Sequence, residues 1–150
     1  MRKICTMLAF IVLGGCLSGC ATGGIKYTEM RAASPRLQSG YARIYFYRSG
    51  TPVGVAVQPD IKINGVSVGT AIPGGFFFVD RRPGKYEITA TTEVQEKISV
   101  ALAAGETKYV QFYLTPGFFV GHANLNVVSR EKAESDMADL SRTGTQTAKQ

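Results

Sequence analysis

Apolar and polar side chains alternate with a period of two along several short stretches of the chain. In residues 41–48 the even positions carry Ala, Ile and Phe before Arg, and the alternation recurs in 85–90, 97–102 and 108–114. A period of two places successive side chains on opposite faces of a strand, so these stretches predict strands with one buried face. Residues 75–79 do not alternate, which predicts a strand covered on both faces.

The segments between these stretches contain residues that favour tight turns. Asn64-Gly65 separates two short apolar stretches, and this pair is a strong hairpin signal because both residues tolerate positive φ. We expect a second hairpin at Ala103–Glu106 and a last strand over 122–128. About eight strands at regular spacing predict a mainly β fold, an antiparallel β-sandwich.

The C-terminal segment changes to a helical period. Ser129 is the expected N-cap. Apolar residues follow at i, i+4 and i+7, namely Ala133, Met137 and Leu140. The pattern predicts one short amphipathic helix ending near Arg142, followed by a disordered polar tail over 143–150. An isolated helix of about twelve residues is marginal in water, so this helix needs a surface on which to pack.

The first nineteen residues have the architecture of a secretory signal peptide. Arg2 and Lys3 precede the apolar stretch Met7–Leu13, which is too short to span a bilayer. The segment Leu17-Ser18-Gly19-Cys20 then resembles the bacterial lipoprotein signal. That resemblance implies that residues 1–19 are removed and that Cys20, the first mature residue, carries the lipid anchor. An ordinary signal peptide and an uncleaved anchor are the alternatives.

The residues after Cys20 bear on where the mature protein resides. In lipoproteins, Asp at this position tends to retain the protein in the inner membrane, so Ala21 implies the outer membrane. Residues 20–40 show only weak periodicity, and we expect a lipidated flexible tether with a reach of roughly 25 Å. The tether would hold a domain spanning 41–142 in the periplasm, clear of the lipid headgroups.

Composition narrows the chemistry that such a domain can perform. The net charge of +6 falls to +4 once Arg2 and Lys3 are removed, and no basic cluster indicates nucleic acid. All three cysteines lie in the first twenty residues, which excludes a cysteine-built zinc site in the folded domain. His122 is the single histidine, which excludes any site that needs two imidazoles. We therefore expect no metal and no cofactor.

Several turn and strand motifs follow one another in a recognisable order. They are the aromatic strand ending in Arg48, Ile63–Val66 with Val68-Gly69, Phe76–Val79, Pro83–Tyr86, and Ala104–Tyr109. Their order resembles a family of small bacterial lipoproteins carrying one β-sandwich domain of unknown function, over about residues 37–140. The Pro-Gly-x-Tyr element is also similar to transthyretin-like and carboxypeptidase-regulatory-like domains. The second resemblance, at the level of the fold, implies a domain that binds or spaces rather than catalyses, whereas the motifs of the first specify the fold better than an activity.

Tyrosines and one arginine on the strand faces opposite the predicted core are the candidate binding residues. They are Tyr41, Arg43, Tyr45 and Tyr47 in the first strand, and Tyr109 and Tyr113 in a later one. Either the C-terminal helix covers them as a second small core, or they form a partner-binding groove, since Tyr and Arg are enriched at hot spots. Phe118 and Phe119, in the next loop, either pack locally or contact a partner or membrane.

The sequence favours a non-enzymatic, lipid-anchored outer-membrane protein that binds or spaces something in the envelope, with an envelope protein as a further candidate partner. One alternative is an envelope hydrolase that uses His122 with a nearby carboxylate. Another is a structural accessory subunit of an envelope complex. Gly65–Gly69 matches the G-x-S-x-G pattern of hydrolases but lacks the strand-to-helix turn that this chemistry needs. We therefore expect a strand serine there.

Overall fold

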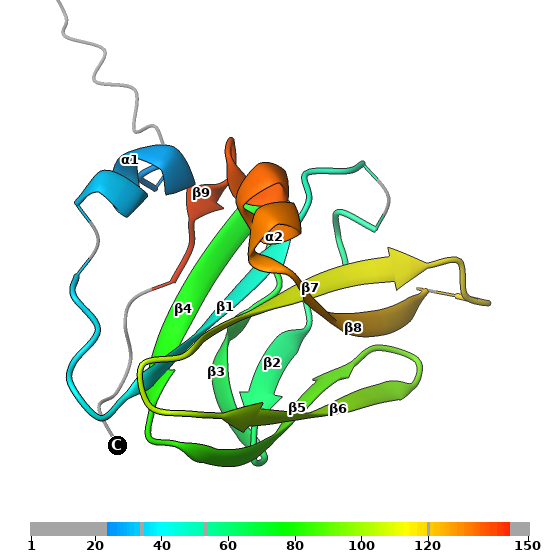
Figure 1. The fold of residues 1–150 in the computed structure, drawn as a ribbon. Helices are drawn as coiled ribbons and strands as arrows, with labels where there is room; N and C mark the ends of the chain where they lie inside the picture. The colour runs from blue at the N-terminus through cyan, green and yellow to red at the C-terminus, as the bar shows by residue number, and fades with distance from the viewer. Residues whose placement is uncertain (1–23, 34, 53, 120, 145–150) are drawn as a thin grey trace, which may run out of the picture.

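Two β-sheets pack face to face in the computed structural model, which describes residues 24–33, 35–52, 54–119 and 121–144 (Figure 1). Within these ranges the elements are α1 (Tyr27–Ala32), β1 (Ala42–Arg48), β2 (Asp60–Ile63), β3 (Val66–Thr70), β4 (Gly75–Arg81), β5 (Gly84–Thr91), β6 (Gln95–Leu102), β7 (Thr107–Thr115), β8 (His122–Val128), α2 (Arg130–Met137) and β9 (Ser141–Arg142). The fold is a mainly β sandwich with a short helix near the C-terminus, as the sequence predicts.

The strands are divided between sheet A, in the order β8-β7-β1-β4-β9, and sheet B, in the order β3-β2-β5-β6. Most neighbouring strands are antiparallel, as β1 is to β4, but β1 is parallel to β7, which the sequence did not predict. The predicted hairpin at Ala103–Glu106 is wrong, because β6 and β7 lie in different sheets. The segment does form a tight turn, closed by a 3.1 Å bond from the N–H of Glu106 to the carbonyl of Ala103. Local turn residues do not determine which sheet the next strand joins.

The core between the sheets is formed by the alternating apolar positions. Ala42, Ile44 and Phe46 of β1 and the inward positions of β2, β5, β6, β7 and β8 are buried together. Phe77 and Val79 of β4 join this core, whereas Phe76 and Phe78 face a second cluster on the outer face of sheet A. β4 is therefore covered on both faces, as its unbroken apolar stretch predicts.

The turn between β2 and β3 is the predicted Asn-Gly hairpin. Asn64 and Gly65 have φ values of 49° and 81°, the left-handed conformation that this type of turn requires. The side-chain carbonyl of Asn64 also accepts a 2.9 Å hydrogen bond from the N–H of Glu87 in β5. The turn thereby links the hairpin to the next strand of sheet B.

The C-terminal helix begins where expected but is shorter than predicted. The Ser129 hydroxyl accepts a hydrogen bond from the N–H of Lys132 at 3.3 Å, so it caps α2. The helix ends at Met137 instead of near Arg142, since β9 pairs in parallel with β4 at the edge of sheet A. The unpaired backbone groups of that edge are a tertiary feature that helical periodicity does not reveal. Leu140 lies beyond the helix yet is buried.

The predicted flexible tether over 20–40 is wrong for residues 25–33. Tyr27 and Met30 in α1 are buried on the outer face of sheet A. The N–H of Tyr27 donates to the carbonyl of Leu140 at 3.0 Å, and the carbonyl of Ile25 accepts from the N–H of Arg142 at 2.9 Å. The fold therefore already includes Ile25, five positions after Cys20.

The predicted signal peptide (1–19), its cleavage residues, Cys20 and most of the polar tail lie outside the described residues. In the part of the chain that the structure describes, neither helix has the length and apolar character needed to cross a bilayer.

Candidate functional site

The tyrosine-rich face of sheet A lies under the two helices (Figure 1). Tyr45, Tyr47 and Tyr109 are only 7%, 2% and 5% exposed. The rings of Tyr45 and Tyr109 stack with their centroids 5.3 Å apart, and Met137 of α2 packs in the same cluster. The prediction that the C-terminal helix covers this face as a second core is confirmed. These three tyrosines are therefore interior residues and form no open groove.

Asp136 connects α2 to the sheet below it. Its carboxylate accepts hydrogen bonds from the Tyr47 hydroxyl at 2.7 Å and the Lys132 ammonium at 2.9 Å. Burial acts to raise the pKa of Asp136, but the hydrogen bonds from Lys132 and Tyr47 outweigh it and lower the pKa below its ordinary value. Burial and the bond to Asp136 raise the pKa of Tyr47 well above its ordinary range. Asp136 therefore holds the helix in place as an anion.

Acid is expected to weaken this connection. A carboxylate whose pKa folding lowers stabilises the folded chain above its ordinary pKa, and that contribution is lost as the pH falls through the lower, folded value. Below about pH 4, the Tm of the wild type should therefore fall more steeply than that of Asp136→Asn, which cannot titrate. Thermal unfolding at a series of pH values tests this. Asp139→Asn, at an exposed position nearby, should follow the wild type; parallel curves for all three proteins would contradict the role of Asp136.

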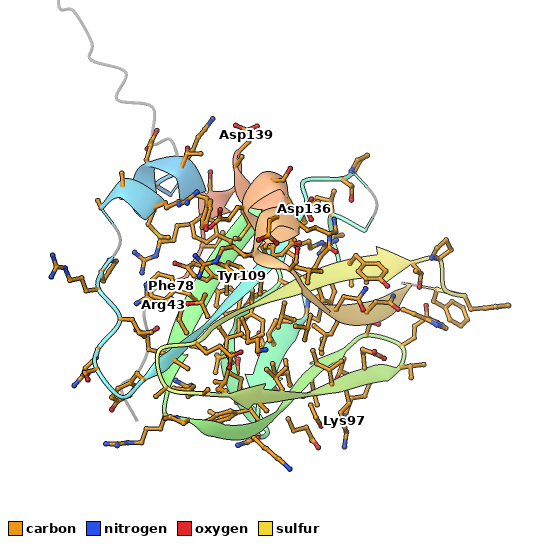
Figure 2. The ribbon with its side chains drawn as sticks, in the orientation of Figure 1. Arg43, Phe78, Lys97, Tyr109, Asp136 and Asp139 are labelled. Carbon is orange, nitrogen blue, oxygen red and sulfur yellow. The ribbon has the colours of Figure 1, made fainter. Side chains whose placement is uncertain are left out.

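Arg43 is a buried structural residue. Its guanidinium forms a two-pronged ion pair with Asp80, with N–O distances of 2.7 and 2.8 Å, and donates to the carbonyl of Pro35 at 3.1 Å. It also lies 4.1 Å from the centre of the Phe78 ring, and Figure 2 shows the two side chains together beside β1 and β4. Arg43 thus fixes the segment before β1 to the sheet, and it is not an open partner-binding residue.

Tyr41 and Tyr113 lie nearer the surface, at opposite ends of β1. Tyr41 precedes β1 and is half-buried, with the Arg82 guanidinium 5.4 Å from its ring centre. Tyr113 lies beyond the register of β1 on β7, and 36% of it is exposed. The structure does not bring these two predicted residues together into one groove.

Phe118 and Phe119 project from the loop between β7 and β8. They are 89% and 86% exposed, with ring centroids 5.2 Å apart, so of the two alternatives open from the sequence, packing within the loop is wrong. The Glu93 carboxylate, from the turn between β5 and β6, accepts backbone N–H bonds from Phe118 at 3.3 Å, Phe119 at 2.7 Å and Gly121 at 3.0 Å. One side chain therefore fixes the backbone that carries both rings.

Thr92 adds a second connection between the same turn and loop. Its hydroxyl donates to the carbonyl of Gly121 at 2.8 Å and accepts from the N–H of Ala123 at 3.1 Å. Hydrogen bonds from the adjacent residues Thr92 and Glu93 therefore hold the loop at its tip and at the point where it leads into β8. The aromatic pair is thus presented on a pre-organised backbone.

The carboxylate nearest to His122 is the one that fixes this loop. The His122 Nε2 atom lies 3.9 Å from a Glu93 oxygen, but that carboxylate already accepts three backbone bonds. Ser67 of the G-x-S-x-G pattern lies in β3, at the edge of sheet B opposite to β6, whereas β6 and its neighbour β5 pack against β8, which carries His122. The structure does not bring Ser67 and His122 together.

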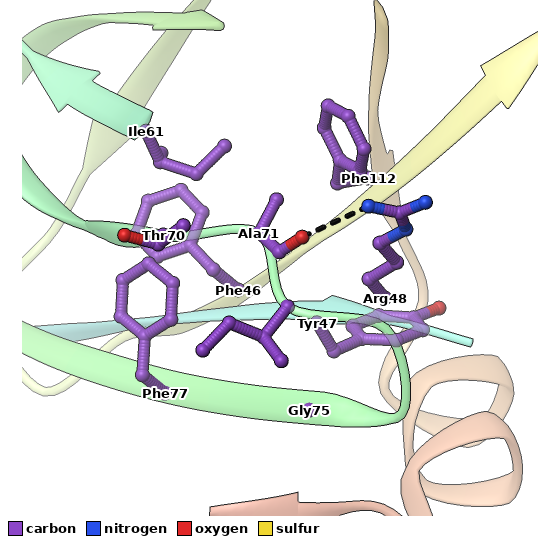
Figure 3. Close-up of a pocket in the computed structure, with 10 residues that line it drawn as sticks. Phe46, Tyr47, Arg48, Ile61, Thr70, Ala71, Gly75, Phe77 and Phe112 are labelled. Carbon is purple, nitrogen blue, oxygen red and sulfur yellow. Dashed lines mark hydrogen bonds between the residues drawn. The ribbon is translucent and has the colours of Figure 1, made fainter. Parts of the chain in front are cut away.

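Arg48 fixes the loop that follows β1 from the inside, and Figure 3 shows its further hydrogen bond to Ala71, just after β3. Its guanidinium is buried and donates to the carbonyls of Val57 at 2.6 Å, Gly54 at 2.8 Å and Ala71 at 3.0 Å. Burial lowers the pKa of Arg48. The adjacent cavity has a volume of about 10 Å³, which is barely enough for one water molecule. This is a structural connection and not a ligand pocket.

Sequence reasoning missed the charged residues that fix the two loops, Glu93 and Arg48, and the packing of α1. The i, i+3 spacing of Tyr27 and Met30 was a signal that could have predicted a buried helical face. No local pattern distinguishes Glu93 from the other acids in turns. Among the described residues, no group of three or more His, Cys, Asp or Glu side chains is placed to hold a metal ion.

The fold and these connections define a two-sheet β-sandwich with a second core under two helices. The chain belongs to the family described as protein of unknown function DUF2846, whose model matches residues 38–123. It is 27% identical over 128 residues to an uncharacterized protein of Haemophilus influenzae, and the matched region covers 83% of this chain and 76% of that relative. Among solved structures, the N-terminal domain of AlgF from P. aeruginosa matches with a TM-score of 0.40 and 20% identity, over 61% of this chain and 98% of that one.

Proposed function

We propose that this chain is a lipid-anchored protein of the bacterial envelope, attached to the outer membrane through Cys20, and that its periplasmic sandwich is a non-catalytic binding module. The sequence Leu17-Ser18-Gly19-Cys20 after an apolar stretch supports the anchor, and Ala21 supports the outer membrane. The observation that carries the proposal is the short spacing between Cys20 and Ile25, which is already hydrogen-bonded within the fold. Ile25 lies five positions after Cys20, and an extended chain of that length spans at most about 17 Å.

This spacing implies a closer association with the membrane than a long flexible tether would give. Because Ile25 is bonded to Arg142 and Tyr27 is buried, the domain cannot move away from an anchor at Cys20 by unfolding a spacer without losing these contacts. The exposed pair Phe118 and Phe119 supports a binding role, since exposed apolar clusters mark interaction sites. Because the Glu93 carboxylate is already hydrogen-bonded to the loop backbone, the loop is better suited to binding than to catalysis with His122.

Replacing Cys20 with alanine is expected to abolish incorporation of labelled fatty acid and partitioning into the detergent phase. Cys16→Ala is the matched control, because Cys16 lies in the segment that the signal peptidase would remove, and this variant should label like the wild type. Density-gradient fractionation of the wild type should place the protein with the outer membrane. Fatty-acid labelling of Cys20→Ala would contradict the anchor, and residence wholly in the inner membrane would contradict the sorting inference alone.

A further inference from the structure

Two apolar loops leave the same end of sheet A. β1 and β7 are parallel neighbours, with Arg48 opposite Phe112, so the segments that follow these strands emerge together. Figure 1 shows the loop after β1 in teal and the loop after β7 as a yellow projection on the same side of the domain. Gly54 lies so close to the Leu114 side chain that a Cβ atom at residue 54 would overlap it. We name residues 54–57 and 116–119 the apolar end.

The apolar end exposes hydrophobic side chains without any charge among them. Phe118 and Phe119 are almost fully exposed and Val55 is half exposed, and neither segment of the apolar end contains a charged residue. Val94, on the turn that fixes the aromatic loop, is exposed as well. Because a monomeric soluble protein rarely gathers such side chains on two adjacent loops, this end is suited to an apolar environment.

The backbone of both loops is hydrogen-bonded from inside the domain. The buried Arg48 guanidinium donates to the carbonyls of Gly54 and Val57, and Glu93 accepts from the N–H groups of Phe118 and Phe119. Water satisfies the polar groups of an ordinary surface loop. A loop that enters hydrocarbon has no water to bond its backbone groups, and an unsatisfied group there is costly, so internal partners are required.

We propose that the apolar end inserts into the interfacial region of a phospholipid bilayer, with Phe118 and Phe119 as its anchors. The projecting shape, the absence of charged residues from both segments and the hydrogen-bonded N–H groups of Phe118 and Phe119 fit a lipid surface, and amphipathic or aromatic side chains are favoured at this depth. The inference rests on the proposed function, because an anchor at Cys20 holds the domain near the bilayer. Insertion of the apolar end is then an intramolecular second attachment to the same membrane. The absence of basic residues from the apolar end fits zwitterionic lipid.

The chain contains no tryptophan, so Phe118→Trp introduces a single fluorescent reporter at the tip of the loop. The full-length protein is purified with its anchor and reconstituted into phosphatidylcholine vesicles with or without brominated acyl chains. We expect the emission of Trp at 118 to shift to shorter wavelength and to be mostly quenched by the brominated lipid. Val66→Trp, at an exposed position on the β2–β3 hairpin, is the matched control and should be quenched little.

Glu93→Gln in the Phe118→Trp background tests the positioning role of the carboxylate. An amide has one acceptor oxygen in place of two and points its own N–H groups at the loop, so the tip is less well held. Quenching should decrease while the thermal unfolding of the domain stays close to that of the parent. Unchanged quenching in this variant would contradict the requirement for internal backbone partners.

The membrane anchor and the apolar end are tested separately. Incorporation of labelled fatty acid reports the anchor, and Cys20→Ala combined with Phe118→Trp, mixed with excess brominated vesicles, reports the loop without it. Quenching at 118 in a protein that retains Cys20 but carries no fatty acid contradicts the anchor alone. Fatty-acid incorporation without quenching at 118, or equal quenching at 118 and 66, overturns the lipid proposal. In the absence of quenching, a protein adduct from a photo-crosslinker at position 118 in cells would identify a protein surface as the occupant instead.

Discussion

Met137→Ala is expected to lower the free energy of unfolding by about 2–5 kcal/mol, the range for truncating a well-packed core side chain. Met137 is fully buried between α2 and the tyrosine-rich face of sheet A, so its removal loses apolar contacts and leaves a cavity. Leu140→Ala should have a similar effect, since Leu140 is buried in the same cluster. Denaturant unfolding measures both. Ser135→Ala, on the exposed side of α2, is the control and should change stability by less than about 0.5 kcal/mol.

Removing the Met137 side chain should also destabilise the N-terminal helix, α1. The N–H of Tyr27 donates to the carbonyl of Leu140, and Arg31 pairs with Glu134 at 3.1 Å, so α1 and α2 are linked. Hydrogen exchange in residues 27–32 should therefore accelerate in Met137→Ala. Wild-type stability in both Met137→Ala and Leu140→Ala would show that the helices are not docked, and the tyrosine face would then be open to a partner.

The strands could be predicted because the information for them is local. The alternation in 41–48 determines which side chains of β1 are buried, and Asn64-Gly65 determines both a turn and the pairing of the strands that flank it. The parallel pairing of β1 with β7 could not be predicted in the same way. It depends on which of several half-buried strands lie side by side, and the segment at Ala103–Glu106 carries turn residues that suit a hairpin and a crossover equally.

The same distinction between local and tertiary information applies to the candidate site. The covering of Tyr45, Tyr47 and Tyr109 was predictable, because an isolated amphipathic helix and an uncovered aromatic face each need a partner surface. The role of Glu93 was not, since its three backbone donors lie about 25 residues further along the chain and become neighbours only when β5–β6 and β7–β8 are assembled. Side chains that fix distant loops are products of the tertiary fold and leave no local signature.

Asp80→Ala is expected to lower the free energy of unfolding by about 3 kcal/mol, the low end of the range for breaking a buried ion pair. The reason is that the two side chains of the ion pair differ in exposure to solvent. The Arg43 side chain is 6% exposed and that of Asp80 30%, so removing the carboxylate leaves a guanidinium that water reaches poorly. Chemical denaturation measures the loss. Asp139→Ala removes an exposed carboxylate whose nearest ammonium is 3.9 Å away and should be nearly neutral.

The double variant Arg43→Met, Asp80→Leu separates the loss of the ion pair from the cost of an unmatched charge. If most of the loss in Asp80→Ala is the stranded guanidinium, the double variant should be more stable than the single one, because the buried charge is gone. Full recovery is not expected, since Arg43 also donates to the carbonyl of Pro35 and lies over the Phe78 ring. A double variant less stable than Asp80→Ala would show that these contacts of the Arg43 side chain, and not its charge pairing, hold the segment before β1 against the sheet.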